Sequence, residues 1–191
     1  SMGTNTLNVS IMGRGSARQA TVDDLYGIVA DNSQILSGVS PNVTIRGTVK
    51  IGNDAPTRTS VTGVSEEFAA MKALELREGR FLRFLDVDRR NNVCVIGSYL
   101  DNEWFLNDAM GQTIKINGIP FTVVGVLEET AESAQGDGDD RIYLPYTLAG
   151  KLNGSGEIDS YVFTMVSEDY VTQAKIAIDD RLYKIYGSTD A

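Results

Sequence analysis

The chain has 191 residues, 17 of them basic and 26 acidic, and a formal net charge of −9. Its length suits one ordinary domain or two small lobes, and its negative charge would repel a phosphate backbone, so nucleic acid is not expected as a partner. No window approaches the roughly 20 consecutive apolar residues that cross a bilayer, and the N-terminus lacks the pattern of a signal peptide.

The first segments of the chain predict a strand followed by a helix. Residues 6–12 alternate apolar and polar side chains, which is typical of a half-buried strand. Thr21 and Asp24 have the spacing of a capping box, and the apolar side chains of residues 22–32 share one helical face. A helix of about ten residues is therefore expected after the capping box.

The next segments predict a β-hairpin and a short helix. Residues 42–52 and 57–64 are rich in strand-forming side chains and are joined by the turn-forming sequence Asn-Asp-Ala-Pro, which indicates a hairpin. Ser65 is followed by Glu66 and Glu67, whose acidic side chains offset the positive end of a helix dipole. A short helix is expected to begin at this serine.

A glycine and two phenylalanines follow this helix in the sequence Gly-Arg-Phe-Leu-Arg-Phe. Gly79 permits a positive φ or a close approach between two backbone segments. Phe81 and Phe84 are expected to anchor the segment on the smaller lobe. The stretch is interpreted as structural rather than catalytic.

The arginine of the same stretch can be given two roles. Arg80 carries five N–H donors, which could tie together neighbouring carbonyl groups or the carboxylate of Asp86. Asp86 is also expected to cap the turn that follows it. We interpret Arg80 as a structural clamp, and contact with a ligand or partner is the alternative.

Cys94 is the only cysteine of the sequence, and histidine is absent. The cysteine lies in an apolar run where a buried, inert thiol is expected, and it has no second cysteine for an intramolecular disulfide. Without histidine, the usual general base, the Ser-His and Cys-His nucleophile pairs and most zinc sites are missing. We therefore predict that the chain is not an enzyme, with no catalytic, cofactor-binding or metal-binding residues and no cofactor.

A buried strand and a second helix are expected around this cysteine. Residues 91–98 favour the strand, and Ser98 with Asp101 has the spacing of a capping box at the start of the helix. Trp104 would lie on this helix. Packing in the core is its expected role, and a binding anchor is the alternative.

The clearest local signal is the dipeptide Asn117-Gly118, which favours a tight type I′ turn between alternating strands. Two paired strands are expected over residues 113–127. Residues 129–140 are polar, acidic and interrupted by glycine, which indicates an exposed loop or hinge.

The last third of the chain predicts two strand-and-helix pairs. Residues 141–152 form a strand and then a helix, with Pro145 at the helix start, where its missing N–H costs nothing. Residues 158–166 alternate as a strand. Ser167 is expected to cap a final helix that ends near Gly187 and carries an apolar stripe, formed by Val171, Ala174, Ile178 and Leu182.

Other candidate sites have simpler explanations. Gly13-Arg14-Gly15 lacks the downstream residues of a phosphate-binding loop. The acidic runs at residues 86–88 and 137–140 lack the spacing of a calcium-binding loop and are expected to be solvated turns. Glu66/Glu67 and Glu128/Glu129 are adjacent in sequence, so a hydrolase using two facing carboxylates would need partners from distant segments.

Several motifs, taken in order, resemble the MacB-like periplasmic core domain, which is the extracytoplasmic region between the first two membrane helices of FtsX/MacB-type ABC transporter permeases. The resemblance covers nearly the whole chain. The matching steps are Gly63-Val64-Ser65, Gly79-Arg80-Phe81, residues 93–97, Gly111-Gln112, Asn117-Gly118 and residues 123–126.

The resemblance implies an α+β fold in which a porter-like α/β sandwich lobe carries an inserted smaller mixed α/β lobe, called Sabre in that family. On this division, residues 1–62 and 131–191 form the porter-like lobe and residues 63–130 form the Sabre-like lobe. The order of the predicted elements agrees with such an insertion. The two chain ends are expected close together on one face.

The implied function is that of the extracytoplasmic domain of an ABC transporter permease, coupling cytoplasmic ATP hydrolysis to export or mechanotransmission. The implied location is the cell membrane, with this domain on the extracellular or periplasmic side. Expected partners are the flanking transmembrane helices, a separate ATPase domain or subunit, and an adaptor protein or a peptide or lipoprotein substrate. The full-length protein is expected to be dimeric.

Two other functions are alternatives to this one. A stand-alone extracellular module that binds a peptide or sugar would require an apolar pocket with convergent polar groups. A carboxylate hydrolase would require two carboxylates within roughly 5 to 10 Å across a cleft.

Overall fold

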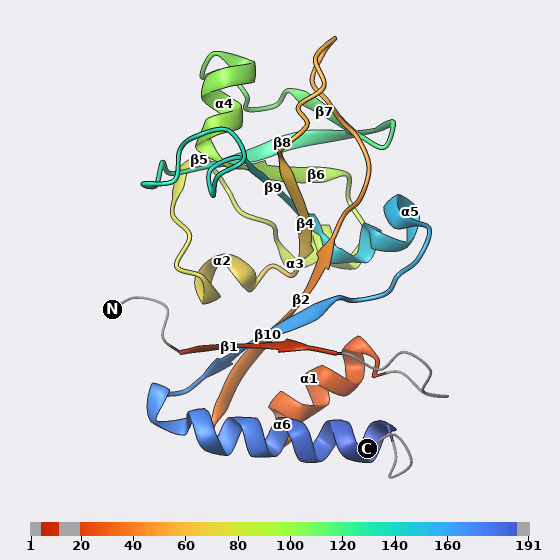
Figure 1. The fold of residues 1–191 in the computed structure, drawn as a ribbon, viewed down its shortest axis with the longest axis vertical. Coiled ribbons are helices and arrows are strands. Elements are labelled where there is room, and N and C mark those ends of the chain that lie inside the picture. The colour runs from red at the N-terminus through yellow and green to blue at the C-terminus, as the bar shows by residue number, and fades with distance from the viewer. Residues whose placement is uncertain (1–4, 12–19, 187–191) are drawn as a thin grey trace. The chain divides into compact units, whose positions relative to one another are not determined.

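The computed structural model describes residues 5–11 and 20–186 (Figure 1). The chain divides into two compact units. The first unit combines both ends of the chain, Ser1–Pro41 and Asp159–Ala191, and the second is Asn42–Ile158. The chain therefore passes from the first unit to the second and back once, and the expectation of an α+β fold with an insertion is confirmed.

The described residues of the first unit form three strands and two long helices. Strand β10 (Ser160–Met165) lies between β1 (Thr6–Ser10) and the start of β2 (Leu36–Thr44), and β1 runs antiparallel to it. Helices α1 (Val22–Asp31) and α6 (Val171–Tyr186) contact each other and lie together in Figure 1.

Local signals in the sequence explain both helices. The backbone N–H of Asp24 donates to Thr21 Oγ1 over 3.2 Å, and the N–H of Thr21 donates to Asp24 Oδ2 over 2.9 Å, so the predicted capping box is confirmed. Ser167 caps a short 3₁₀ turn, η2 (Glu168–Tyr170), ahead of α6. The predicted stripe of α6 faces inward, with Ala174 and Ile178 buried. Gly187 lies outside the described residues.

The described ends of the chain lie at opposite ends of α6. The N–H of Met165, just before this helix, donates to the carbonyl of Asn5 over 2.8 Å, whereas the last described residue, Tyr186, ends the helix. A helix of 16 residues is about 24 Å long. Both ends belong to the first unit, but the expectation that they lie close together is wrong for the described residues.

The second unit is built on one mixed sheet, with strands in the order β2-β4-β9-β6-β8-β7-β3 and with β5 paired to β8. Beyond β2, its strands are β3 (Val49–Lys50), β4 (Ser60–Val64), β5 (Leu76–Gly79), β6 (Val93–Ile96), β7 (Thr113–Ile116), β8 (Ile119–Leu127) and β9 (Arg141–Pro145). Its helices are α2 (Phe68–Met71), α3 (Phe84–Asp88), α4 (Ser98–Phe105), α5 (Ala149–Asn153) and the 3₁₀ helix η1 (Tyr146–Leu148).

The boundaries of this unit differ from those expected from the sequence. The predicted inserted lobe covered residues 63–130, whereas the observed unit extends outward on both sides and is the larger of the two. Strand pairing explains the difference, because β4 and β9, which flank the predicted lobe, lie parallel to each other within its sheet. The assignment of residues 1–62, 63–130 and 131–191 to porter-like and Sabre-like lobes stays a prediction.

The sheet of the second unit curls back on itself. Its order begins with β2 and ends with β3, and only residues 45–48 separate these two strands in the chain. Such a connection spans at most about 18 Å, which brings the two edges of the sheet near each other. The inner face of the curled sheet is therefore enclosed.

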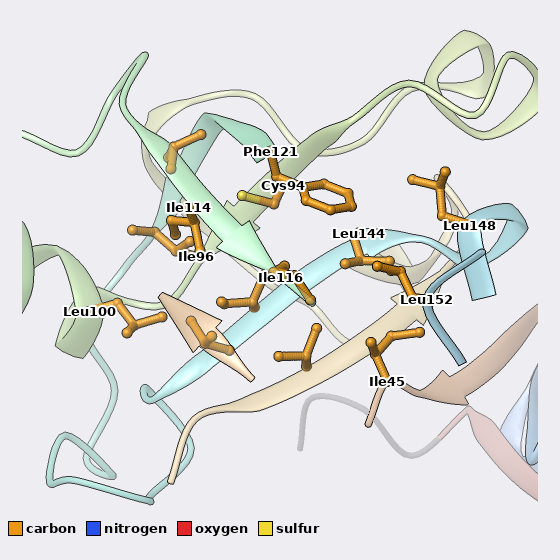
Figure 2. Close-up of a cluster of buried hydrophobic side chains, with 14 of the residues drawn as sticks. Ile45, Cys94, Ile96, Leu100, Ile114, Ile116, Phe121, Leu144, Leu148 and Leu152 are labelled. Carbon is orange, nitrogen blue, oxygen red and sulfur yellow. The ribbon is translucent and has the colours of Figure 1, made fainter. Parts of the chain in front are cut away.

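Buried apolar side chains fill this enclosed space (Figure 2). Figure 2 shows Ile96, Ile114, Phe121 and Leu144 from neighbouring strands directed toward one another, with Leu148 and Leu152 contributed by the helical segment after β9. Cys94 belongs to the same cluster and is 0% exposed, as the sequence predicted. Burial raises the pKa of its thiol to about 12.

The predicted hairpin within residues 42–64 is confirmed only in part. Residues 42–44, at the end of β2, pair antiparallel with residues 62–64 of β4, but the rest of the first strand and the expected tight turn are wrong. The segment containing β3 does not pair with β4; Val49 faces Ile116 of β7 instead. The Asn-Asp-Ala-Pro turn is closed only by a bridge between Ile51 and Asp54. The reason is burial, because Val49 and Ile51 join the enclosed core by crossing to the far edge of the sheet.

The predicted capping box of α4 is also wrong. Gly97 is the N-cap, and the hydroxyl of Ser98 is buried with no hydrogen-bond partner among the described residues. Asp101 is turned inward, where it accepts the N–H of Ala109 over 3.0 Å and pairs with Arg77. Burial of this carboxylate against a distant cation outweighs the local capping pattern.

The Asn117-Gly118 hairpin is confirmed. Both residues have positive φ, +51° and +78°, as a type I′ turn requires, and Ile116 faces Ile119 across the turn. The side chain of Asn117 also donates to the carbonyls of Arg46 and Leu152 over 2.8 and 2.9 Å.

The segment between β2 and β3 is held by two asparagine side chains. Asn117 Oδ1 accepts the N–H of Thr48 over 2.9 Å. Asn153 Oδ1 accepts the N–H of Arg46, and its amide donates to the carbonyl of Thr44, both over 2.9 Å. The two carboxamides therefore supply the hydrogen bonds that the backbone of this connection does not find in a strand.

We predict that replacing Asn117 separates its two roles. Asn117→Gly keeps the positive φ but removes three side-chain hydrogen bonds, so we expect a loss of about 2–3 kcal/mol in the free energy of unfolding in urea. Asn117→Ala should cost about 1 kcal/mol more because alanine is strained at this φ. Asn107→Gly is the control, since Asn107 also has positive φ but forms no such contacts, and equal stability of the two glycine variants would contradict the role of Asn117.

We also predict that Cys94 does not react in the folded protein. A thiol with a pKa of about 12 and no exposed surface offers almost no thiolate at pH 8. Reaction with a colorimetric disulfide reagent should be complete within minutes in denaturant and at least 100-fold slower in buffer. Rapid labelling in buffer, with the circular dichroism spectrum unchanged, would show that the core opens locally around β6.

Candidate functional site

An ion pair with several additional hydrogen bonds joins Arg80 to Asp86 in the second unit. Arg80 Nη1 donates to Asp86 Oδ2 over 2.6 Å and to the carbonyl of Phe81 over 3.0 Å. Asp86 also accepts the N–H of Arg83 over 2.8 Å and the amide of Asn91 over 3.2 Å. The predicted structural clamp is confirmed, but Asp86 caps the start of its own helix, α3, through the N–H of Arg83, and not the turn that follows it.

Two glycines allow the backbone on either side of this clamp to approach β8. Gly79 has a φ of +71°, and a Cβ there would lie 2.2 Å from the carbonyl oxygen of Val124. A Cβ on Gly125 would lie 2.0 Å from the carbonyl oxygen of Arg80. Glycine is therefore required at both positions, and the interpretation of Gly79 as a close-approach residue is confirmed.

The two phenylalanines of this stretch behave differently. Phe81 packs against Tyr143 with ring centroids 6.1 Å apart, and Tyr143 in turn contacts Phe68 at 5.1 Å. Phe84 does not anchor as predicted, because its side chain is 61% exposed. Val87 occupies the inward face of α3 and leaves Phe84 on the outward face.

The acidic segment before β9 is partly buried rather than wholly solvated. Residues 129–137 are exposed, as expected, but Asp139 and Asp140 are buried. Asp139 accepts the N–H and hydroxyl of Thr130, both over 2.8 Å. Asp140 accepts the hydroxyl of Thr59 over 2.6 Å, so these carboxylates fasten the loop to the sheet.

The remaining candidates of the sequence include Trp104 and the Gly13-Arg14-Gly15 segment. Trp104 is partly buried against the core, in agreement with its expected packing role. Among the described residues, no group of three His, Cys, Asp or Glu side chains is arranged to hold a metal ion, and no helix is long and apolar enough to span a bilayer. Gly13-Arg14-Gly15 lies outside the described residues. The pairing of Arg77 with Asp101 had no signal in the local sequence.

The charge of Asp86 is favoured by its surroundings. Burial alone would raise the pKa of Asp86, but the hydrogen bonds and charge of Arg80, with those from Arg83 and Asn91, outweigh it, and the pKa is lowered. An aspartate with a depressed folded-state pKa stabilises the fold above its unfolded pKa of about 4. This contribution is lost as the pH falls through the lower folded-state value.

We predict that Asp86→Asn lowers the free energy of unfolding by about 2–3 kcal/mol at pH 7, because the guanidinium of Arg80 loses its charged acceptor. The difference from the parent protein should shrink progressively below pH 4, as the parent carboxylate becomes protonated. Urea titrations at several pH values measure both effects. Asp88→Asn, at an exposed position of the same helix, is the control, and a difference that does not change with pH would contradict the role of the Asp86 charge.

Comparison with known proteins places the chain in a family. The MacB-like periplasmic core domain matches residues 1–181. The macrolide export ATP-binding/permease protein MacB of Aggregatibacter actinomycetemcomitans is 26% identical over 197 residues, which cover 99% of this chain and 30% of that protein. MacB of Hyphomonas neptunium is 30% identical over 203 residues, which cover 100% of this chain and 30% of that protein. The chain thus spans about 30% of the length of these relatives.

Solved structures show the same fold. The periplasmic region of MacB from Actinobacillus actinomycetemcomitans superimposes with a TM-score of 0.80 at 26% identity, over 98% of this chain and 87% of that one. The extracellular domain of the noncanonical ABC-type transporter YknZ from Gram-positive bacteria also gives a TM-score of 0.80, at 17% identity, over 98% and 97% of the two chains. The second likeness concerns the fold alone.

These matches favour the permease domain over a stand-alone binding module. They agree with the resemblance found in the motifs of the sequence. The chain belongs to the MacB-like periplasmic core domain family, the extracytoplasmic domains of membrane-anchored, MacB-type ABC transporter permeases.

Proposed function

We propose that this domain transmits the work of a cytoplasmic ATPase domain or subunit to the outside of the membrane, in export or in mechanotransmission. Its proposed partners are the flanking transmembrane helices, a second copy in a dimeric permease, and an adaptor protein or a peptide or lipoprotein substrate. The names of the relatives, which are macrolide export proteins with ATP-binding and permease functions, support the export form of this proposal.

The observation that carries the proposal is the division of the chain into two compact units. The chain crosses between the units twice, once after Pro41 within β2 and once after Ile158, directly before β10. Two crossings leave a pair of units free to move as separate bodies when their interface is small. Such a pair can convert movement imposed on one unit into displacement of the other.

The interior of the second unit supports movement as one body. Its core is enclosed by a curled sheet, the connection between its edge strands is fastened by Asn117 and Asn153, and the segment after β5 is clamped by Arg80 and Asp86. Packed cores transmit strain with little deformation. We propose that ATP-driven movement reaches the first unit through the membrane helices and is passed to the second unit as a rigid displacement.

We predict that the distance between the two units changes with nucleotide in the full permease. Spin labels on Lys175→Cys in α6 and Glu103→Cys in α4 occupy exposed positions in different units. Pulsed electron paramagnetic resonance should show different distance distributions with and without a non-hydrolysable ATP analogue. Cys94 can remain, because its buried thiol does not take up label.

A pair within the second unit, Glu103→Cys with Lys115→Cys, provides the matched control and should give the same distribution in both states. Crosslinking the two units by a short bifunctional reagent between cysteines at their surfaces should stop transport while leaving ATP binding intact. Full transport by a crosslinked permease would refute coupling through relative movement of the units.

A further inference from the structure

The segment around α3 combines two exposed apolar side chains of the helix with three exposed arginines that flank it in sequence. Phe84 is 61% exposed and Leu85 is 52% exposed. Arg83, Arg89 and Arg90 around them are also exposed. These five residues are called the α3 surface below. They lie within eight consecutive positions of the sequence.

Contacts on the inward side of α3 fix the position of the α3 surface. Asp86 and Val87, on the inward face of the same helix, are buried, and Asp86 is fixed by Arg80. The carbonyl of Val87 also accepts the hydroxyl of Thr147 over 2.6 Å. Phe84 and Leu85 therefore cannot turn inward unless these contacts break. A preorganised surface loses little entropy when it binds.

One arginine of the surface occupies a strained backbone position. Arg90 has a φ of +54°, a left-handed conformation that glycine and asparagine adopt far more easily than arginine. Its neighbour Asn91 donates its backbone N–H to the carbonyl of Asp86 over 2.9 Å, which closes the turn. A glycine would satisfy this turn at lower cost, so the turn itself does not require an arginine.

The charge of the α3 surface defines what can bind to it. None of its three guanidinium groups forms an ion pair with another described residue. One exposed acid, Asp88, lies among them, so the local charge is positive on a chain with a net charge of −9. The same surface of a second copy would be repelled, which argues against a symmetric contact between two α3 surfaces.

The size of the surface argues for a short segment rather than a lipid bilayer or a large interface. Two half-exposed side chains offer on the order of 200 Å² of apolar area, far less than the roughly 1,200 Å² of a stable protein interface. Helices that lie in a membrane surface carry a longer apolar face than this helix of five residues. A short anionic segment with one or two apolar side chains matches both the area and the charge.

We propose that the α3 surface binds a short acidic segment of a partner protein. An apolar side chain of that segment packs on Phe84 and Leu85, and its carboxylates pair with Arg83, Arg89 and Arg90. Bidentate pairing with carboxylates is the interaction for which arginine is best suited. This binding is independent of the coupling proposed above, because it is a property of the isolated domain.

The test uses a fluorescein-labelled peptide in which a central Leu-Phe pair is flanked by three glutamates on each side. A matched peptide carries glutamine in place of every glutamate. Fluorescence anisotropy at about 50 mM salt should show binding of the acidic peptide that weakens as salt is added. The glutamine peptide should bind at least tenfold more weakly. Equal binding of the two peptides, or no binding of the acidic one, would overturn the proposal.

Variants of the domain locate the binding. Binding of the acidic peptide should weaken at least tenfold in each of two double variants. The first is Phe84→Ser with Leu85→Ser, and the second is Arg83→Gln with Arg89→Gln. Leu106→Ser is the control, because Leu106 is a still more exposed apolar residue, at 84%, elsewhere in the same unit. An equal effect of Leu106→Ser would mean that the peptide binds apolar surface without selection, which overturns the proposal.

Arg90→Gly distinguishes binding from folding. Relief of the strained φ should raise the melting temperature by a few degrees. Loss of the guanidinium should weaken binding of the acidic peptide several-fold. Leu106→Gly, which relieves a similar φ of +50°, should raise the melting temperature and leave binding unchanged. Unchanged peptide binding by Arg90→Gly would contradict the proposed pairing of Arg90 with the carboxylates.

Two further measurements exclude other occupants. Cosedimentation with vesicles of phosphatidylglycerol, lost in the Phe84→Ser/Leu85→Ser variant, would make a membrane the occupant and overturn the proposal. A dimer seen by sedimentation velocity and abolished by the same variant would make a second copy the occupant, with the same consequence. We expect neither vesicle binding nor dimerisation to depend on Phe84 and Leu85.

Discussion

The second unit depends on the closure of a curled sheet around an apolar core. Closure places the connection between β2 and β3 at the end of the sheet. Few backbone groups of this connection can pair there with a neighbouring strand. The carboxamides of Asn117 and Asn153 satisfy this backbone from the β7–β8 turn and from the end of α5. A turn residue and a helix-terminal residue thus supply hydrogen bonds to the backbone of a connection whose residues 46–48 are exposed.

The clamp and the outward face of α3 are two results of the same local design. A helix of five residues cannot fold by itself, so α3 needs the charged hydrogen bonds of Asp86 and the burial of Val87 to exist at all. Once the inward positions are committed to those contacts, helical geometry directs Phe84 and Leu85 outward. The exposed apolar pair is therefore a consequence of how the segment is stabilised, and its arginine neighbours give it a definite charge.

The sequence predicted the elements whose causes are local. The capping box at Thr21, the turn at Asn117 and the close approach at Gly79 were all recognisable, because each depends on residues within a few positions. The pairing of β3 with β7 could not be predicted, because it is decided by which distant edge completes the core. The same limit applies to Asp101, which does not form the predicted helix cap. It pairs instead with Arg77, which is 24 residues away in the sequence. The exposure of Phe84 could not be predicted either, because the hydrophobicity of a side chain does not say which side of a short helix packs inward.

The thiol at the centre of the enclosed core has a consequence for biogenesis. Domains of this family work on the extracytoplasmic side of the membrane, where thiols are readily oxidised. In the mature protein, Cys94 is inaccessible to oxidants and to other thiols. A newly translocated chain has no such shield, so mixed disulfides with other secreted proteins can form until β6 is covered by its neighbouring strands. Rapid completion of the sheet around β6 therefore protects the nascent domain from covalent trapping in the secretory space.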